Sequence, residues 1–400
     1  MNKKNFLSFL YSLSLRTSIQ LVGQLMVGEL IALIFFPFIK VGKLIKEIPH
    51  LKFILSCLIV LLIAQIISDF QNRTAIHDLL RGWALILFSV ISIIFIVNQL
   101  YKDQKSIVFF LVGTFIAALF FQEGDIDLQK QFSNTNYFKE RLMAFCNYGI
   151  LILSYFFMKE KKENIILLLF LFYSAFSFFL DARSNGIFFL LSFIMLFLKF
   201  RNIKISFMTM AKISIVALPL LYGAYILYAN AILYDNFGGK NSQEQLAKVN
   251  NPYNPLELFI YGRTEVFVLA QAISERPIFG YGSWGKDPGD KFAYLTAVLS
   301  ESPSYNSRGY IHAHSLLLGF WAYSGILGFI ALLFLFFKLI KIILKIFNNK
   351  EKSNFLPLIV FLSINILWSA LFSPIQGIRL SLPFFIALIL SENYNQSLKI

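Results

Sequence analysis

Apolar runs of about 20 residues recur along the whole chain and are separated by short stretches that carry lysine and arginine. A helical run of that length matches the hydrocarbon thickness of a bilayer, and a helix satisfies its own backbone hydrogen bonds where no water is present. The composition agrees, because 57% of the residues are hydrophobic and only 14% are charged. The sequence therefore predicts an all-α, polytopic membrane protein.

The apolar runs predict about eleven transmembrane helices, or about twelve if residues 6–38 form a short hairpin instead of one segment. The predicted spans are Ser18–Phe38, Leu51–Ile67, Gly82–Leu100, Ser106–Phe121, Leu142–Met158, Asn164–Leu180, Asn185–Leu198, Ile205–Tyr228, Ser315–Phe337, Phe355–Phe372 and Leu380–Leu390. One membrane domain results, with N-terminal helices in residues 1–228, a large polar loop in 229–313 and C-terminal helices in 314–400. We expect the first span to be a retained anchor, since no small-residue cleavage site follows the basic start.

Basic residues are concentrated in alternate loops, which predicts how the chain is oriented in the membrane. These loops are Lys40–Lys52, Lys102–Lys105, Lys159–Lys162, Lys199–Lys204 and Lys338–Lys352. Loops rich in lysine and arginine stay in the cytoplasm, so the large polar loop should face outward. The net charge of +14 is thereby explained by orientation instead of nucleic-acid binding. The two cysteines lie inside apolar runs and indicate neither a disulfide framework nor a metal site.

Several cationic side chains should meet at the outward face. Arg183 and Arg379 stand at the outer ends of predicted spans, and Arg263 lies in the large loop. Charged groups at one membrane level are costly, so their gathering suggests an anionic ligand. Two alternatives stay open: the first two arginines could reach lipid headgroups, and Arg263 could pair with a loop carboxylate. Glu29, inside the first predicted span, is expected to pair with a neighbouring helix.

The large loop contains a predicted helix followed by a glycine-rich turn. Apolar residues three and four apart predict an amphipathic helix over Pro255–Glu275, on whose apolar face Arg263 would lie. Pro277 ends it, and the sequence GYGSWG (280–285) predicts a tight turn that carries aromatic residues. Trp284 and Tyr310 could stack on sugar rings, or they could belong to the aromatic belt of the membrane interface.

His314 is the strongest candidate for a catalytic residue, because an imidazole can accept a proton from an attacking hydroxyl near neutral pH. His312 lies beside it. The sequence His314-Ser315, nine residues, Gly325, two residues, Gly328 resembles the signature of the O-antigen ligase and O-antigen polymerase family.

The likeness continues upstream of that signature, through RPIFGYGSWG and Arg263 to ARSNG around Arg183, and covers Asp181–Gly328. Three positions depart from the family pattern. Ser315 stands where asparagine is commoner, Tyr323 where many members carry an acid, and Phe267 where tryptophan is frequent. The missing acid puts an assisting carboxylate near His314 in doubt.

The resemblance implies a GT-C-like inner-membrane glycosyltransferase that moves a glycan from undecaprenyl diphosphate to a sugar hydroxyl at the periplasmic face. His314 would be the general base of an inverting reaction, without metal or cofactor. The implied diphosphate-binding residues are Arg183, Arg263, Arg379 and Arg308. The implied acceptor-binding residues are Trp284, Tyr310, His312 and Ser315.

Three functions stay open, two within the family and one from a competing class. A polymerase of O-antigen or another surface polysaccharide is favoured, partly because the acidic position is missing. A ligase that transfers the glycan to the lipid A-core, as in lipopolysaccharide biosynthesis, is the alternative. A lipid-linked glycan flippase belongs to a different class, but most predicted spans lack the ionisable residues that a transport path would need. Membrane lipids and a regulator of chain length are the other partners expected.

Overall fold

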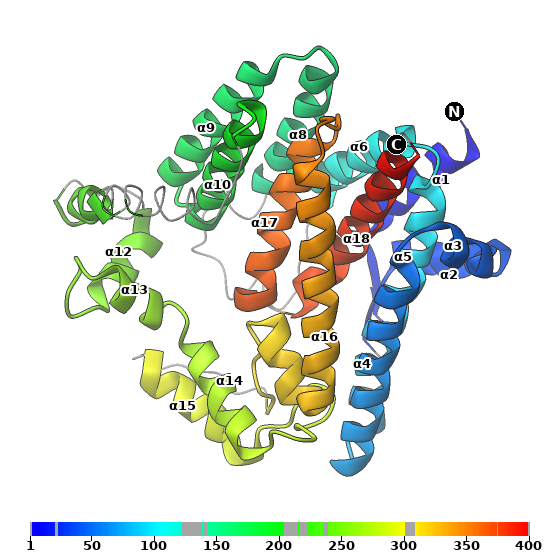
Figure 1. Ribbon diagram of the computed structural model, residues 1–400. Coiled ribbons are helices and arrows are strands. Elements are labelled where there is room, and N and C mark those ends of the chain that lie inside the picture. The colour runs from blue at the N-terminus through cyan, green and yellow to red at the C-terminus, as the bar shows by residue number, and fades with distance from the viewer. Residues whose placement is uncertain are drawn as a thin grey trace.

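The computed structural model describes residues 2–20, 23–121, 138, 142–203, 215, 219, 222–223, 225–234, 239–300, 309–373 and 375–398 (Figure 1). Four helices in this part of the chain are long and apolar enough to cross a membrane: α4 (Leu51–Gln71), α5 (Ile76–Leu100), α10 (Arg183–Phe200) and α16 (Leu316–Asn348). Shorter apolar helices accompany them. The prediction of an all-α polytopic membrane protein is confirmed.

The bundle around these helices is completed by α6 (Lys105–Phe120), α8 (Met143–Lys159), α9 (Glu163–Phe179), α17 (Leu356–Phe372) and α18 (Ile375–Ser397). Helix α16 packs against α4 and also contacts α17 and α18, while α5 packs along α18. Their apolar side chains form one large continuous core. The predicted span Ile205–Tyr228 falls mostly outside the described residues.

The N-terminal segment differs from the prediction. Residues 18–38 do not form one span: β1 (Ser18–Gln20) and β2 (Gln24–Met26) make an antiparallel hairpin, and only then do α2 (Val27–Phe35) and a 3-10 turn (Phe36–Phe38) follow. The polar residues of the hairpin explain the break, since the sheet ladder pairs their backbone groups. Helix α1 (Lys3–Ser14) packs on α6, and α3 (Val41–Glu47) leads into α4.

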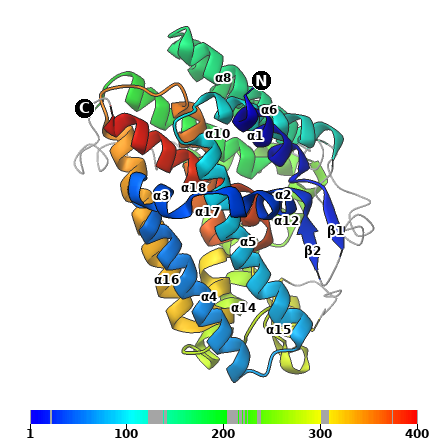
Figure 2. The ribbon, with the colours of Figure 1, turned by 90° about the vertical axis from the view of Figure 1, so that its right-hand side faces the viewer.

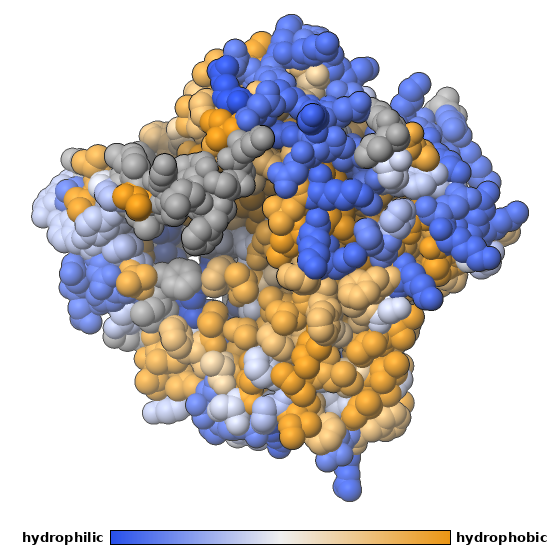
Figure 3. All heavy atoms as spheres, in the orientation of Figure 1, coloured by the Kyte–Doolittle hydropathy of each residue, from blue (hydrophilic) through white to orange (hydrophobic). Residues whose placement is uncertain are grey.

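The lysine-rich loops lie at one end of the bundle, as the sequence predicts. Lys102 pairs with Glu47, and Lys352 pairs with Glu163. Gln104 and Asn349 both bond to the C-terminal turns of α18, which joins the two groups. In Figure 1 this end carries both chain termini, while α14, α15 and the far end of α4 lie at the opposite end, and Figure 2 shows the same division. A broad hydrophobic surface separates a hydrophilic upper end from a smaller hydrophilic group below (Figure 3).

The described part of the large loop folds into short helices. They are α12 (Gly239–Ala247), α13 (Pro255–Tyr261), α14 (Thr264–Glu275), a 3-10 turn (Pro288–Asp290) and α15 (Lys291–Ser300). The predicted continuous helix over Pro255–Glu275 is therefore wrong, because the chain leaves helical geometry at Arg263, with φ −139° and ψ 35°. Arg263 stands at the N-terminus of α14 instead of sharing the face of one long helix.

Helix α16 is broken at Gly325, where φ is 70° and ψ is −170°. The backbone groups freed by the break bond to the glycine-rich turn that follows α14. The backbone N–H of Tyr281 donates to Ala322 O at 2.8 Å, and that of Gly282 donates to Tyr323 O at 3.0 Å. Beyond the break, the Ile326 N–H donates to Pro277 O at 3.0 Å. The turn thus completes the hydrogen bonding of a short half-helix, residues 316–324, that begins directly after His314.

Candidate functional site

The start of α16 holds His314 at the end of an extended segment. Ser315 is the N-cap of the helix: its hydroxyl accepts a hydrogen bond from Leu318 N at 3.2 Å and donates one to Ala370 O of α17 at 3.1 Å. Both roles of the hydroxyl are in use and Ser315 is fully buried, so it fixes the chain next to His314. His314 itself is half-buried and makes no hydrogen bond to the residues that the structure describes.

Arg263 lies at the same end of α17. Its Nη1 donates to Phe372 O at 3.3 Å, two residues beyond the carbonyl that Ser315 contacts. The guanidinium lies 5.6 Å from the ring centroids of both Trp368 and Phe372. Unpaired carbonyls at a helix C-terminus and aromatic faces both attract a cation. The last turn of α17 therefore holds Arg263 and the segment that carries His314 side by side.

Arg263 has no carboxylate within ion-pair distance in the described part of the chain. Its site is partly buried, and this burial lowers the pKa of the Arg263 guanidinium, with nearby Glu265 acting in the opposite direction. An arginine keeps its proton at any physiological pH, so a positive charge is held here without a counter-ion from the described residues. This is the electrostatic condition for binding an anion.

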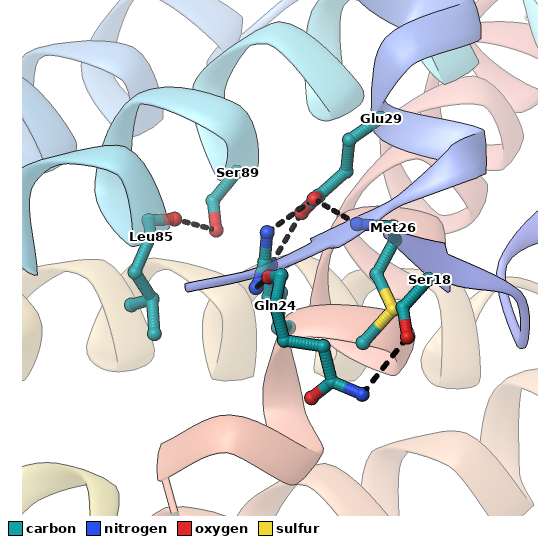
Figure 4. Close-up of polar contacts among 7 residues, drawn as sticks. Ser18, Gln24, Met26, Glu29, Leu85 and Ser89 are labelled. Carbon is teal, nitrogen blue, oxygen red and sulfur yellow. Dashed lines mark hydrogen bonds and ion pairs between the residues drawn. The ribbon is translucent and has the colours of Figure 1, made fainter. Parts of the chain in front are cut away.

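Arg379 is in a different situation. Its guanidinium pairs with Glu29 through two nitrogens, and Nη1 donates to Gln24 O at 2.8 Å, so the N-terminal hairpin is tied to α18. Figure 4 shows Glu29 and Gln24 in this network, and the Met26 N–H also donates to Glu29, at 3.1 Å. The expectation that Glu29 pairs with a neighbouring helix is confirmed. Arg379 also lines a cavity of about 30 Å³ among apolar side chains, which is too small for a saccharide.

Arg183 begins α10 and is also engaged by protein groups. Its Nη2 donates to Gln245 Oε1 at 2.8 Å, and its Nε lies 3.6 Å from Asp181 Oδ1. Five residues further along α10, Phe188 makes an edge-to-face contact with Trp368 at 5.7 Å. Arg183 therefore stands on a helix that touches the aromatic support of Arg263, but its charge is already partly balanced.

The predicted aromatic residues Trp284 and Tyr310 contact charged residues at the start of α5. The Arg81 guanidinium lies 4.2 Å from the Trp284 ring, and the Tyr310 hydroxyl contacts both carboxylate oxygens of Asp78 at 3.3 Å. His312 is half-buried and lies between Tyr310 and His314 in the chain. Arg308 lies outside the described residues.

Four residues of this region were missed by the sequence reasoning. Trp368 and Phe372 form an aromatic pair four residues apart at the outer end of a predicted span, which is a signal that a sequence search for cation-binding faces could use. Asp78 and Arg81 are charged residues at the start of α5, and their significance comes only from the contacts with Tyr310 and Trp284. Within the described residues, no group of three or more histidine, cysteine or acidic side chains could hold a metal ion. Whether the mechanism is metal-independent stays a prediction.

Comparison with known proteins gives one match. Residues 149–333 match a family model described as O-antigen ligase. The matched range contains Arg183, Arg263, His314 and both glycines of the GxxG pair, and it ends before α17. No curated protein matches the chain.

Proposed function

On the premise that residues 149–333 form a domain of the O-antigen ligase and polymerase family, we propose that this protein transfers a glycan from undecaprenyl diphosphate to a sugar hydroxyl. The family match supports the prediction that this multi-pass membrane protein is a glycosyl-transfer enzyme. The donor, the periplasmic location of the site in an inner membrane and the inverting course are parts of the proposal.

The unpaired charge of Arg263 is the observation that carries the proposal. A diphosphate leaving group is anionic, and a guanidinium offers it several donors in a fixed plane. Arg263 Nη1 donates to Phe372 O, which leaves the other N–H groups of the guanidinium for the ligand. Arg183 would assist from the start of α10, whereas Arg379 is engaged with Glu29 and contributes through the hairpin that it holds.

His314 would act on the acceptor. Its imidazole has no protein hydrogen-bond partner in the described part of the chain, so a ring nitrogen is available to accept the proton of the attacking hydroxyl. The C–O bond from the anomeric carbon to the diphosphate would break as the new glycosidic bond forms on the opposite face. Arg263 would stabilise the charge that develops on the departing diphosphate.

Polymerase is the function that we propose, with ligase as the second candidate. The matching family is described as O-antigen ligase, which supports the second candidate. Where many members carry an acid, Tyr323 donates from its hydroxyl to Ile311 O at 2.7 Å, so this position fixes the segment leading to His314 instead of supplying a carboxylate. Deleting the gene distinguishes the two: loss of a polymerase leaves single repeat units on lipid A, and loss of a ligase leaves carrier-linked polymer.

The catalytic assignment is tested by complementing the deletion strain with Arg263→Gln and with His314→Ala. We expect both variants to reduce surface glycan on a gel by about 100-fold or more, since removal of one transition-state donor or one general base has that effect. Arg276→Gln is the matched control, because Arg276 also stacks on an aromatic ring, Tyr281 at 4.6 Å, away from α17. Normal glycan from both variants at normal protein level would refute the assignment.

A further inference from the structure

A second polar cluster lies at the start of α5, outside the matched domain. Its centre is the carboxylate of Asp78, which is fully buried. Besides the Tyr310 hydroxyl, the carboxylate contacts His77 Nε2 at 3.1 Å and Arg81 Nη1 at 3.7 Å. A buried carboxylate is stable only when it is paired and hydrogen-bonded, so these groups form one fixed unit.

Arg81 extends from this unit over the indole of Trp284. The stem of Arg81 is covered by the N-terminal hairpin, because a Cβ added at Gly23 would lie 2.9 Å from its Cγ. The guanidinium carries five N–H donors, of which one nitrogen faces Asp78 at 3.7 Å. Arg81 is partly exposed, with a side-chain exposure of 32%, so its outer edge is available to a ligand.

Trp284 shows two features that its packing does not require. Its backbone is left-handed, with φ 63°, a conformation that costs a residue with a side chain about 1–2 kcal/mol. Its indole N–H is buried and has no hydrogen-bond acceptor among the described residues. Strained backbone and an unsatisfied buried donor are both features that gather at ligand sites.

The charges of the two clusters differ, and this difference separates their ligands. Arg263 has no acidic partner among the residues that the structure describes and so favours an anion. Arg81 is balanced by Asp78, so the second cluster combines a carboxylate, a guanidinium and an indole without an excess positive charge. A neutral polyhydroxylated ring suits this set, because its hydroxyls can accept hydrogen bonds from the exposed edge of the guanidinium and the ring can stack on an aromatic face, while the buried carboxylate holds the guanidinium in place.

An extended segment connects the second cluster with His314. Tyr310 forms a β-bridge with Lys286, Ile311 N donates to Gly285 O at 2.7 Å, and Ser315 is also extended. Alternate residues of an extended chain point to the same side, so Tyr310 and His314 share a side over about 13 Å. The intervening Ile311 is buried against α14 on the other side. This length suits a short oligosaccharide that runs from the second cluster to the catalytic imidazole.

We propose that Arg81 and Trp284, together with Tyr310, bind a neutral saccharide of the acceptor and hold its hydroxyl toward His314, with the buried Asp78 as the residue that positions Arg81 and Tyr310. Arg81, positioned by Asp78, then determines acceptor specificity from a helix outside the O-antigen ligase domain. This inference rests on the proposed function for its direction toward His314, while saccharide binding itself can be measured independently.

The test uses two probes on the purified full-length protein in detergent. The first is the phosphate-free repeat-unit oligosaccharide released by mild acid from the surface polysaccharide of the strain that makes this protein. The second is inorganic pyrophosphate. Binding is measured by isothermal titration calorimetry for the wild type, Arg81→Lys, Arg263→Gln and Arg276→Lys. Arg81→Lys keeps the charge opposite Asp78 but removes the planar, forked group.

We expect Arg81→Lys to bind the oligosaccharide at least tenfold more weakly, with pyrophosphate affinity unchanged, and Arg276→Lys to match the wild type. If Arg81→Lys lowers the melting temperature, Trp284→Phe provides the same comparison without changing any charge. Equal oligosaccharide affinity in the wild type and the variants, or no saturable binding to the wild type, would overturn the inference. Pyrophosphate binding that Arg263→Gln does not weaken would count against the proposed function alone.

Discussion

Replacing Gly325 by alanine should separate the half-helix of α16 from the glycine-rich turn. The backbone at Gly325 lies in a region that only glycine adopts readily, which costs another residue about 1–3 kcal/mol. An added Cβ would also lie 1.9 Å from Ile278 O and 2.6 Å from its carbonyl carbon. Both are backbone atoms, so the turn must move as a whole.

Movement of the turn breaks the hydrogen bonds that join it to α16. Those from Tyr281, Gly282 and Ile326 are worth about 0.5–1.5 kcal/mol each. Together with the backbone strain, the loss of unfolding free energy should be roughly 3–7 kcal/mol. This loss of unfolding free energy is measured by denaturant titration of the purified protein in detergent. The amount of surface glycan should also fall, because the segment before Leu316 loses its support.

Gly289→Ala is the matched control for this prediction. Gly289 is also left-handed, with φ 66°, but a Cβ there would meet nothing within 4 Å. It should therefore show only the backbone penalty of about 1–2 kcal/mol and keep normal glycan. If Gly325→Ala were no more destabilised than Gly289→Ala, the close approach of Ile278 would not be the reason for glycine at position 325.

Three further predictions concern stability and topology. Arg379→Met should lower the free energy of unfolding by about 3–5 kcal/mol, because the Glu29 carboxylate is then buried without its partner. Adding Glu29→Leu to the same chain should restore much of that loss. Additive losses in this double-mutant cycle would contradict the pairing. The hydrogen bond from Lys291 lowers the pKa of Glu275, so this pair stabilises the loop fully at pH values above the ordinary glutamate pKa, and the stabilisation is lost as the pH falls through the lowered pKa. Proteolysis of the loop should therefore increase on acidification in the wild type. A Glu275→Gln variant with the same acid response would refute this. In a chain without native cysteines, a cysteine replacing Lys291 should react with a membrane-impermeant maleimide added to spheroplasts, whereas one replacing Lys350 should react only after permeabilisation; the reverse pattern would invert the proposed orientation.

The candidate site could be predicted from the sequence only as a set of residues. The order of Arg183, Arg263 and the His314 motif, with the positions of the lysines, was enough to predict a resemblance that the family model over residues 149–333 supports, and to place these residues near one end of a helical bundle. Sequence could not show that Arg379 is already paired with Glu29, while Arg263 has no counter-ion in the described part of the chain. That distinction depends on two long-range contacts: Arg379 and Glu29 are 350 residues apart in the chain, and Arg263 and Phe372 are 109 residues apart.

The sequence by itself determined the membrane class and the gathering of the lysine-rich loops at one end of the bundle, because apolar length and lysine distribution act locally along the chain. The tertiary structure alone decided that residues 18–26 form a hairpin, that α14 begins at a break after α13, and that α16 is interrupted at Gly325. Each of these depends on hydrogen bonds with a distant segment, such as Gln24 with Arg379 or Tyr323 with Gly282, which satisfy backbone groups that a regular span would have paired internally.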